Sequence, residues 1–396
     1  MRVLISGAGI AGPTLAFWLK QYGIEPTIIE VAPKLRTGGY IIDFWGTGYK
    51  IAGRMGLLSQ INDVGYRVRE VHVVDRSGKR ISGFPVDVFW RATGGLFTSL
   101  RRGDLAAVIF GAIDGRVETI FGETLSAIEQ DQQAVRVKFE RSGEREFDLV
   151  VGADGLHSRV RQLVFGEESR FEHYLGIKVA AFEVQGYRPR DELVYVMYTE
   201  VGQQVTRFTM RDDRTLFLFT FADPSPEGPE MHSLAAQKAL LHRRYGQSGW
   251  ELPQILDALD ATDELYFDRV SQIRMDPQQG LWTRGRVTLV GDAASCASLL
   301  AGEGSGLAIT AAYILAGELK RSGGDYTTAF ARYQQAFAPF VSGKQEGAAK
   351  MGGNFAPKSK SALWLRNLVM NFMNLPWVAD FAFGRQLTEN IELPNY

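Results

Sequence analysis

The 396-residue sequence contains a single cysteine, Cys296, so the chain cannot form an internal disulfide. It also has no excess of charge of either sign, because 44 basic residues are balanced by 45 acidic ones and the formal net charge is −1. A nucleic-acid-binding chain would carry clustered positive charge, so we expect no nucleic-acid partner. The lack of disulfides fits a reducing compartment, and we predict a cytoplasmic protein.

Long apolar runs are missing as well. No stretch of about 18 apolar residues is present, so we expect no membrane span. The N-terminus, MRVLISGAG, leads from a short apolar segment directly into glycines, whereas a signal peptide needs a longer apolar region and a cleavage site. Hydrophobic residues make up 45% of the sequence, enough to bury a sizeable core without metal or disulfide staples. The length suits two or three domains.

The N-terminal residues predict a nucleotide-binding unit. A strand, a helix and a second strand are expected in this order, at residues 2–6, 11–22 and 26–29. Between the first strand and the helix lies Gly7-Ala-Gly-Ile-Ala-Gly12, in which Gly7 allows a tight turn, Gly9 lets a pyrophosphate approach the backbone and Gly12 lets the helix pack on the strand. Glu30 follows the second strand and can accept hydrogen bonds from ribose hydroxyls. This motif alone does not separate NAD from FAD, and a glycine turn without a ligand is the alternative.

A second motif runs from Asp148 to Arg161 with the sequence DLVVGADGLHSRVR. A strand leads into a glycine and then into Asp154-Gly155, where the backbone can approach a dinucleotide. The Asp154 carboxylate can hold either a ligand hydroxyl or the start of the next helix, and Arg159 and Arg161 can meet phosphate charge. The alternative is a structural turn with a helix cap.

A third motif, Gly285-Arg-Val-Thr-Leu-Val-Gly-Asp-Ala-Ala294, ends a buried strand at Gly291 and places Asp292 beside a ligand. A glycine cluster, Gly302-Glu-Gly-Ser-Gly306, then opens a long helix predicted at residues 306–320. The N-terminal end of a helix carries partial positive charge and can stabilise negative charge on a bound group.

These three motifs, in this order and spacing, resemble the class A flavin-dependent aromatic monooxygenases of the para-hydroxybenzoate hydroxylase type, over roughly residues 1 to 345. The resemblance implies a Rossmann-like fold that binds FAD. Arg102, in Arg102-Gly-Asp-Leu, matches the family arginine that reaches the FAD, and Asp292 matches the residue at the ribityl chain. The implied cofactor-binding residues are Gly7, Gly9, Ala11, Gly12, Glu30, Arg102, Asp154, Gly155, Gly291, Asp292, Gly302 and Gly304.

The chain departs from the family pattern at several positions. Relatives often carry a histidine after Gly-Asp-Ala-Ala, where this chain has Ser295, and a Pro-Pro pair, where it has Ser298 and Leu299. An asparagine often closes the second glycine cluster of relatives, and this chain has Gly306 there. The basic residue that often follows the ribose glutamate is replaced by Val31. With these departures we still expect flavin binding, and the details that they change concern the reactive face of the flavin.

The resemblance also implies the chemistry. NAD(P)H would reduce FAD, O₂ would add to form a flavin C4a-hydroperoxide, and its distal oxygen would pass to an electron-rich substrate. No second dinucleotide fingerprint is present, so NADPH or NADH is expected as a transient co-substrate. Because the cofactor carries the difficult step, no catalytic side chain is assigned and no metal site is expected. The five histidines lie in unrelated contexts, and we expect each to be structural.

The predicted architecture is an α/β fold with three parts. A discontinuous FAD-binding domain comprises residues 1–70, 98–170 and 271–320, a β-sheet substrate-binding domain comprises residues 71–97 and 171–270, and a helical region comprises residues 321–396. Strands expected at residues 177–184, 192–199, 204–210 and 215–221 predict a largely antiparallel sheet in the second part. We favour a monomer.

Three residues of this sheet are candidates for substrate contact. By the resemblance, Lys178 stands at a strand position where relatives place a polar contact, with an exposed lysine as the alternative. Phe217 and Phe219 alternate along one strand with Phe221, so they share a face and form either an aromatic wall for the substrate or part of the core.

A narrower resemblance concerns the substrate. The segments 38–46 and 295–304 and the aromatic C-terminal extension are similar to the soil-type tetracycline-inactivating monooxygenases. This implies a polycyclic phenol or enol such as a tetracycline, and a role in antibiotic resistance. The alternatives are a polyketide-tailoring hydroxylase, a flavoprotein reductase that inserts no oxygen, and a non-catalytic flavin-binding protein. The apolar segment 360–384 is interpreted as a packed helix pair, a membrane-surface helix or a lid over the substrate.

Overall fold

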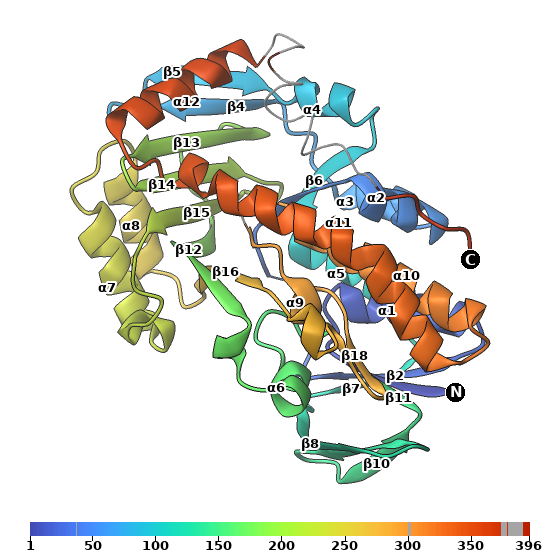
Figure 1. The fold of residues 1–396 in the computed structure, drawn as a ribbon. Coiled ribbons are helices and arrows are strands. Elements are labelled where there is room, and N and C mark those ends of the chain that lie inside the picture. The colour runs from blue at the N-terminus through green and yellow to red at the C-terminus, as the bar shows by residue number, and fades with distance from the viewer. Residues whose placement is uncertain (37, 300–301, 374–377, 379–390) are drawn as a thin grey trace.

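The structure is a computed structural model that describes residues 1–36, 38–299, 302–373, 378 and 391–396. Two large sheets and a set of long C-terminal helices make up most of it (Figure 1). The predicted fold class, α/β with a Rossmann-like part, a second β-sheet and a C-terminal helical region, is confirmed.

The first sheet has six strands in the order β17-β18-β11-β1-β2-β7. These strands are β1 (Arg2–Ser6), β2 (Glu25–Glu30), β7 (Glu118–Phe121), β11 (Leu149–Gly152), β17 (Thr283–Arg284) and β18 (Val287–Leu289). All neighbours pair in parallel except β17 and β18, which are antiparallel. Strands β1 and β11 are buried along nearly their whole length, as expected for a parallel sheet that is covered on both faces.

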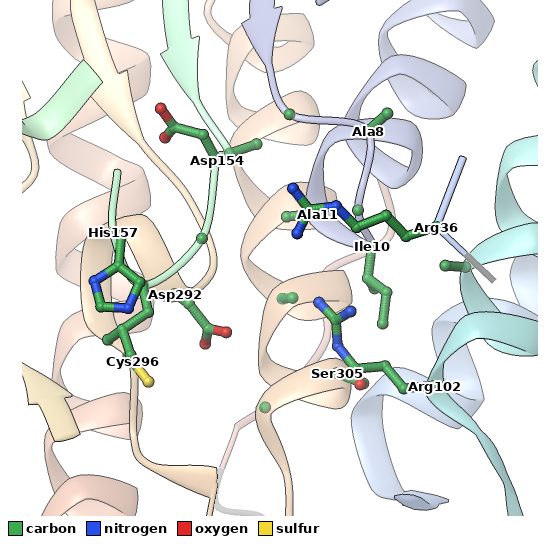
Figure 2. A pocket seen from close by; sticks show the side chains of 18 of the residues that line it. Ala8, Ile10, Ala11, Arg36, Arg102, Asp154, His157, Asp292, Cys296 and Ser305 are labelled. Carbon is green, nitrogen blue, oxygen red and sulfur yellow. The ribbon is translucent and has the colours of Figure 1, made fainter. Parts of the chain in front are cut away.

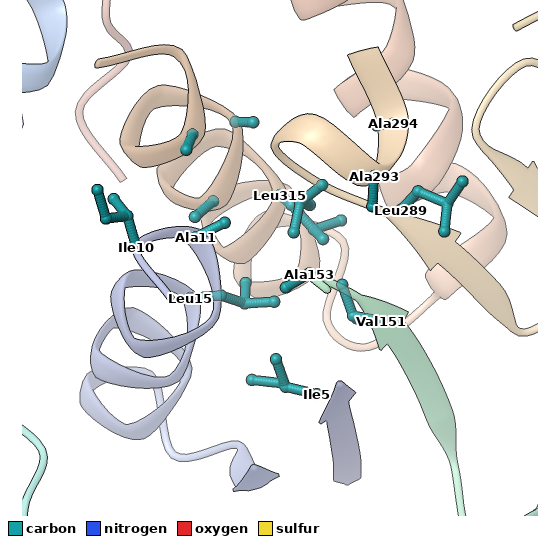
Figure 3. Packing of buried hydrophobic residues seen from close by; sticks show 14 of the residues in the cluster. Ile5, Ile10, Ala11, Leu15, Val151, Ala153, Leu289, Ala293, Ala294 and Leu315 are labelled. Carbon is teal, nitrogen blue, oxygen red and sulfur yellow. The ribbon is translucent and has the colours of Figure 1, made fainter. Parts of the chain in front are cut away.

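Helix α1 (Ala11–Gln21) and helix α10 (Gly304–Arg321) pack together against this sheet (Figure 3). Leu15 of α1 and Leu315 of α10 are fully buried in the same cluster as Ile5 of β1 and Val151 of β11. The strand, helix and second strand predicted at the N-terminus are all present, with ends that differ by one residue. The apolar spacing of these segments was therefore sufficient to predict them.

The second sheet has seven strands in the order β16-β12-β15-β14-β13-β4-β5. They are β4 (Glu70–Val74), β5 (Arg80–Pro85), β12 (Glu172–Gln185), β13 (Val194–Glu200), β14 (Gln203–Thr209), β15 (Arg214–Ala222) and β16 (Tyr266–Ile273). The neighbours are antiparallel except β4 and β13, which are parallel. The prediction of a largely antiparallel sheet is confirmed.

The two faces of the seven-stranded sheet have different neighbours. One face packs on α7 (Leu234–Tyr245) and α8 (Leu252–Asp260). Phe217 and Phe219 belong to this core and are 0% exposed. Of the two predicted roles for these phenylalanines, they therefore have the role in the core and do not form a wall for the substrate. Side chains alternate along β15, and the opposite face of this strand carries Leu216 and Leu218. We call the face with Leu216 and Leu218 the open face of the sheet.

Shorter elements connect the two sheets. A two-stranded sheet of β3 (Ile41–Trp45) and β6 (Phe97–Arg101) is antiparallel, and β8 (Leu125–Gln130), β9 (Val135–Phe139) and β10 (Glu144–Phe147) form a three-stranded sheet. The remaining helices of this part are α2 (Gly46–Arg54), α3 (Leu58–Val64), α4 (Asp87–Ala92), α5 (Arg102–Gly111), α6 (Arg159–Phe165) and α9 (Asp292–Ser295).

The C-terminal region contains α11 (Tyr326–Phe355) and α12 (Lys360–Phe372), and α12 lies along β5 (Figure 1). Met370 of α12 packs on the core of the open face, whereas Trp364 is 66% exposed and Phe372 is 50% exposed. The helix is thus packed on one side only. Residues 374–377 and 379–384 of the predicted helix pair lie outside the described residues. Within the described residues, none of the helices is both long and apolar enough for a membrane span.

Candidate functional site

A cavity of about 700 Å³ lies where the three predicted motifs meet (Figure 2). It runs along the carboxyl ends of β1, β2 and β11 and reaches the start of α10, the position at which open parallel sheets bind their ligands. Ten of the twelve predicted cofactor-binding residues line it: Gly7, Gly9, Ala11, Glu30, Arg102, Asp154, Gly155, Asp292, Gly302 and Gly304.

The other two predicted residues, Gly12 and Gly291, do not line the cavity but pack closely against residues that do. A Cβ atom on Gly12 would lie 1.9 Å from the carbonyl oxygen of Gly7, so only glycine lets α1 start this close to the turn. Gly291 has a φ of +62° and precedes α9, and a Cβ there would lie 3.1 Å from the Cβ of Ala11. Both positions need glycine for packing rather than for direct contact with a ligand.

The turn after β1 fits a pyrophosphate. Gly7 has a φ of +110°, and a Cβ on it would lie 2.4 Å from the carbonyl oxygen of Ala153, which excludes any larger residue. At Gly9 an added Cβ would have Arg102 as its nearest neighbour, at 3.9 Å, so this glycine faces open space. The backbone N–H groups at the start of α1 are thereby left accessible to an anion.

Glu30 has the geometry for a ribose. Its carboxylate accepts hydrogen bonds from the backbone N–H groups of Ala8 and Ala32, each at 2.9 Å. An ionised carboxylate has about four acceptor positions, so two hydroxyl groups of a ribose can still bind. The guanidinium of Arg36 lies 4.0 Å from Glu30 and is largely exposed beside the cavity.

The Asp154 segment combines both roles that the sequence left open. Asp154 lines the cavity, and its carboxylate also accepts hydrogen bonds from the Ser158 hydroxyl and from the backbone N–H of Val160 at the start of α6. Burial raises the pKa of Asp154, and these hydrogen bonds oppose the rise. Arg161 is fully buried and donates to the carbonyl oxygen of Ala293 at 3.0 Å. It therefore connects the second and third motifs instead of meeting a phosphate.

The far end of the cavity suits a flavin ring and its ribityl chain. Asp292 and Arg102 point into this space from opposite sides (Figure 2). Burial raises the pKa of Asp292, while Arg102 lowers it. Tyr40 and Tyr266 line the same end with ring centroids 5.7 Å apart, and burial raises the pKa of Tyr40 to about 12. Both phenols are therefore neutral hydrogen-bonding groups.

His157 also lines the cavity, although sequence analysis predicted only a structural role for this residue. Its Nε2 lies 3.5 Å from Asp268 on β16, and its Nδ1 lies 2.9 Å from Glu168. Hydrogen bonds to Asp268 and Glu168 raise the pKa of His157 to about 10, so the imidazole is a cation at neutral pH. The contribution of Tyr40, Tyr266 and His157 depends on contacts between segments far apart in the sequence, which no local motif reveals.

The structure corrects the prediction that Lys178 contacts the substrate. The lysine is 0% exposed, and its ammonium group lies 2.6 Å from Glu230 and 3.4 Å from Asp223. It lies on the side of the sheet that faces α7, away from the cavity. Ala180 and Phe182, two and four residues further along β12, share its face and belong to the core on that side. Lys178 is therefore neither a substrate contact of this cavity nor an exposed lysine.

The donor set of the cavity fits FAD: an anion-binding turn, a ribose carboxylate, a half-buried carboxylate at the ribityl position and a helix N-terminus at the ring. By contrast, the described residues contain no group of three or more His, Cys, Asp or Glu side chains that could hold a metal ion.

Comparisons with known proteins agree with this geometry. The family model described as an FAD binding domain matches residues 112–322. An uncharacterized protein of Mycobacterium tuberculosis is 39% identical over 87% of this chain and 91% of its own length. A flavin-dependent monooxygenase of Legionella longbeachae is 31% identical, over all of this chain and 98% of its own length.

Solved structures are similar over the whole chain. The tetracycline destructase Tet(51) has a TM-score of 0.84 and 29% identity, with 100% of this chain and 99% of that chain covered. Klebsiella pneumoniae HpxO in complex with FAD and uric acid has a TM-score of 0.80 at 21% identity, over 98% and 96% of the two chains, and so agrees in fold. The motifs, the cavity and these matches together show that the chain belongs to the FAD binding domain family and is an FAD-dependent monooxygenase.

Proposed function

We propose that this protein uses NAD(P)H and O₂ to hydroxylate a polycyclic phenol or enol, such as a tetracycline. In the balanced reaction one oxygen atom enters the substrate and the other leaves as water, while NAD(P)H is oxidised to NAD(P)⁺. The observation that carries the proposal is the position of the cavity. Its flavin end, at Tyr40 and Leu299, adjoins half-buried apolar side chains on the open face of the seven-stranded sheet, among them Leu218 and Met197.

The residues of the cavity would share the binding of FAD. The turn from Gly7 to Gly9 would hold the pyrophosphate, Glu30 the ribose and Asp292 the ribityl hydroxyls, while Arg102 would contact the flavin end. When bound, FAD supplies the hydride acceptor and the reaction with O₂. The protein positions the substrate on the open face and keeps water away from the flavin.

The division into domains is part of the proposal. Residues 1–70, 98–170 and 271–320 would form the FAD-binding domain, because they supply every strand of the six-stranded sheet. Residues 71–97 and 171–270 would form the substrate-binding domain, since they supply nearly all of the seven-stranded sheet. The helices after residue 320 would join the two, as α11 contacts α10 on one side and β12 on the other.

The tetracycline part of the proposal comes from relatives. Tet(51) and Tet(55), both named tetracycline destructases, are similar to this chain along its full length, each with a TM-score of 0.84. A FAD-dependent monooxygenase of Sarocladium schorii, asL4, is also similar over the full length at 28% identity. This second relative shares the reaction class, within which a polyketide-tailoring hydroxylase is the alternative.

The proposal is tested by following the flavin absorbance of the purified holoenzyme without oxygen. We expect NADPH or NADH to bleach the flavin, and tetracycline to accelerate the bleaching, because the ligand on the open face would gate access to the flavin. With ¹⁸O₂, one labelled atom should then enter the tetracycline. Rapid bleaching without ligand and no label in any product would identify a reductase instead. Bleaching that responds to other polycyclic phenols but not to tetracycline would replace the substrate class.

A further inference from the structure

Asp43 is a carboxylate on an otherwise apolar wall. It lies on β3, where Phe44 points into the core of the six-stranded sheet and Ile42 belongs to that core and also lines the cavity. Ile41, Asp43 and Trp45 therefore occupy the opposite side of the strand. Ile41 and Trp45 are half-buried and pack with the cluster on the open face of the seven-stranded sheet. Asp43 thus stands between the two apolar surfaces where a substrate would lie.

A hydrogen-bonded chain holds this carboxylate. The Ser99 hydroxyl, directly opposite on β6, donates to Oδ1 of Asp43 at 2.6 Å. Ser99 is fully buried and also forms a hydrogen bond with the phenol of Tyr195 on β13. Ser99 thus connects the phenol of Tyr195 with the carboxylate of Asp43. The chain leaves Oδ2 of Asp43 for another partner.

The surroundings of Asp43 favour a proton acceptor. Its side chain is exposed to solvent, yet the enclosing protein raises its pKa by desolvation, and only the Ser99 hydrogen bond opposes that rise. A carboxylate at the wall of an enclosed space has both properties. Among the described residues no charged group contributes to this pKa, and the titratable group that faces Asp43 is Tyr195.

The charged side chains of neighbouring elements are engaged with other partners. They are Arg101 of β6 with Glu183 at 3.2 Å, Lys344 of α11 with Glu303 at 2.6 Å, and Arg366 of α12 with Gln204 and Thr199 at 3.0 Å each. Within the part of the chain that the structure describes, Asp43 therefore forms no ion pair with a cation, and it keeps its basicity for a ligand.

The strand also sets the distance to the flavin end of the cavity. Tyr40, which lines that end, precedes Asp43 by three residues, and an extended chain advances by about 3.3 Å per residue. Asp43 is therefore at most about 10 Å from Tyr40 along the backbone. A ligand with several fused rings can span this interval, whereas a single ring cannot.

We propose that Asp43 accepts the proton of an acidic hydroxyl group on the bound substrate, an inference that rests on the proposed function. In this step the O–H bond of the substrate breaks and an O–H bond forms at Oδ2 of Asp43. The electron pair stays on the substrate oxygen and makes its ring a better target for electrophilic oxygen. Ser99 is a positioning residue that holds Oδ1, and Tyr195 orients Ser99.

The test compares the wild-type holoenzyme with Asp43→Asn, using tetracycline as the probe. Asparagine keeps the acceptor for Ser99 but cannot take a proton. We expect tetracycline to bind and to accelerate anaerobic flavin reduction nearly as in the wild type. The rate of oxygen transfer should fall about 100- to 10,000-fold, the usual contribution of a general base, and NADPH oxidation should yield hydrogen peroxide instead of product.

The pH dependence separates a base from a structural residue. In the wild type, the yield of product per NADPH should hold until the pH falls through the raised pKa of Asp43. In Asp43→Asn the yield should recover only when the pH rises above the pKa of the tetracycline hydroxyl itself, because the ligand then ionises without help. The matched control is Asp63→Asn, an exposed residue of α3 whose backbone carbonyl, not its carboxylate, binds Arg211. It should behave as the wild type.

Each outcome has a distinct meaning. A product yield in Asp43→Asn that matches the wild type at every pH would overturn the role of Asp43 and leave the proposed function intact. Failure of tetracycline to bind or to accelerate flavin reduction in the wild type would overturn the substrate class, and with it this inference. Recovery at high pH in Asp43→Asn alone would support both.

Discussion

Lys178 shows how a single buried charge is tied to stability rather than to the substrate. Burial alone would raise the pKa of Glu230, but the hydrogen bond and charge of Lys178, together with a backbone hydrogen bond, outweigh burial and lower that pKa, so Glu230 stays ionised beside the lysine. Removing one member of a buried ion pair leaves the other uncompensated, which costs about 3–5 kcal/mol. We expect Lys178→Met to lose that much free energy of unfolding in urea, while its Michaelis constant for tetracycline stays unchanged.

The control for this prediction is Lys138→Met on β9, where the lysine is exposed and its loss should change stability by less than about 0.5 kcal/mol. If Lys178→Met unfolded at the wild-type urea concentration but bound tetracycline poorly, Lys178 would be a substrate residue after all.

His157 gives the second prediction at this scale, a dependence of stability on pH. Its pKa rises from 6.5 to about 10 in the folded protein through Asp268 and Glu168. The folded state therefore binds the proton more tightly than the unfolded state. The resulting stability is complete below pH 6.5 and is lost as the pH rises through about 10. We expect urea unfolding at a series of pH values to show this decline, and His157→Gln to flatten it.

His173 provides the comparison, because it is exposed. The His173→Gln variant should retain the full slope of the wild type between neutral and alkaline pH. An equal slope in His157→Gln and the wild type would mean that the imidazole is not charged in the folded protein.

At the scale of elements, strand β15 separates the core from the substrate surface by simple alternation. Phe219 is fully buried against Phe182 and Tyr245, whereas Leu218 is half-buried on the open face. Phe219→Ala should cost about 3–5 kcal/mol in the free energy of unfolding, as expected for an aromatic residue removed from a core. Leu218→Ala should cost less and should raise the Michaelis constant for tetracycline.

The two variants are measured side by side by urea unfolding and by steady-state kinetics. The reversed pattern, with a kinetic effect at Phe219 and a stability effect at Leu218, would put the substrate on the α7 and α8 side of the sheet. If both variants changed the free energy of unfolding and the Michaelis constant to the same extent, the two faces of β15 would not differ in their roles.

The same strand explains what the sequence could and could not predict. The alternation of Phe217, Phe219 and Phe221 predicted a shared face, and that is what the structure contains. Because β15 is apolar on both faces, the pattern could not say which face meets helices and which meets the flavin. That choice depends on α7 and α8, which lie beyond the strand in the chain.

Local geometry was more informative at the glycine motifs. The turn from Gly7 to Gly12 was predictable because its glycines are required by contacts within the strand, turn and helix, such as the close approach of Gly12 to Gly7. The β3–β6 pair and the flavin-end residues Tyr40 and Tyr266 could not be found in this way. Strands β3 and β6 are separated by more than 50 residues, and their pairing register sets the position of Asp43.

At the scale of the whole molecule, the cavity joins segments from distant parts of the chain. Its lining comes from the N-terminal unit, from the Asp154 loop, from β16 and from the start of α10. A cofactor that contacts all of them binds only the folded state, so it adds a free energy of RT ln(1 + [FAD]/Kd) to stability. At a free FAD concentration of 100 times the Kd, this amounts to about 2.7 kcal/mol.

Removal of FAD should therefore lower the urea midpoint of the wild-type protein, and added FAD should restore it in a concentration-dependent manner. Gly7→Ala is the matched variant, because its Cβ would lie 2.4 Å from the Ala153 carbonyl oxygen and would distort the turn that receives the pyrophosphate. It should unfold at a lower urea concentration, and added FAD should shift that midpoint little. Gly111→Ala, which adds a Cβ where no atom lies within 4 Å, should respond to FAD as the wild type does. If the wild-type midpoint did not depend on FAD while the flavin remained bound, the cofactor would bind folded and unfolded chains equally, and the cavity described here would not be its site.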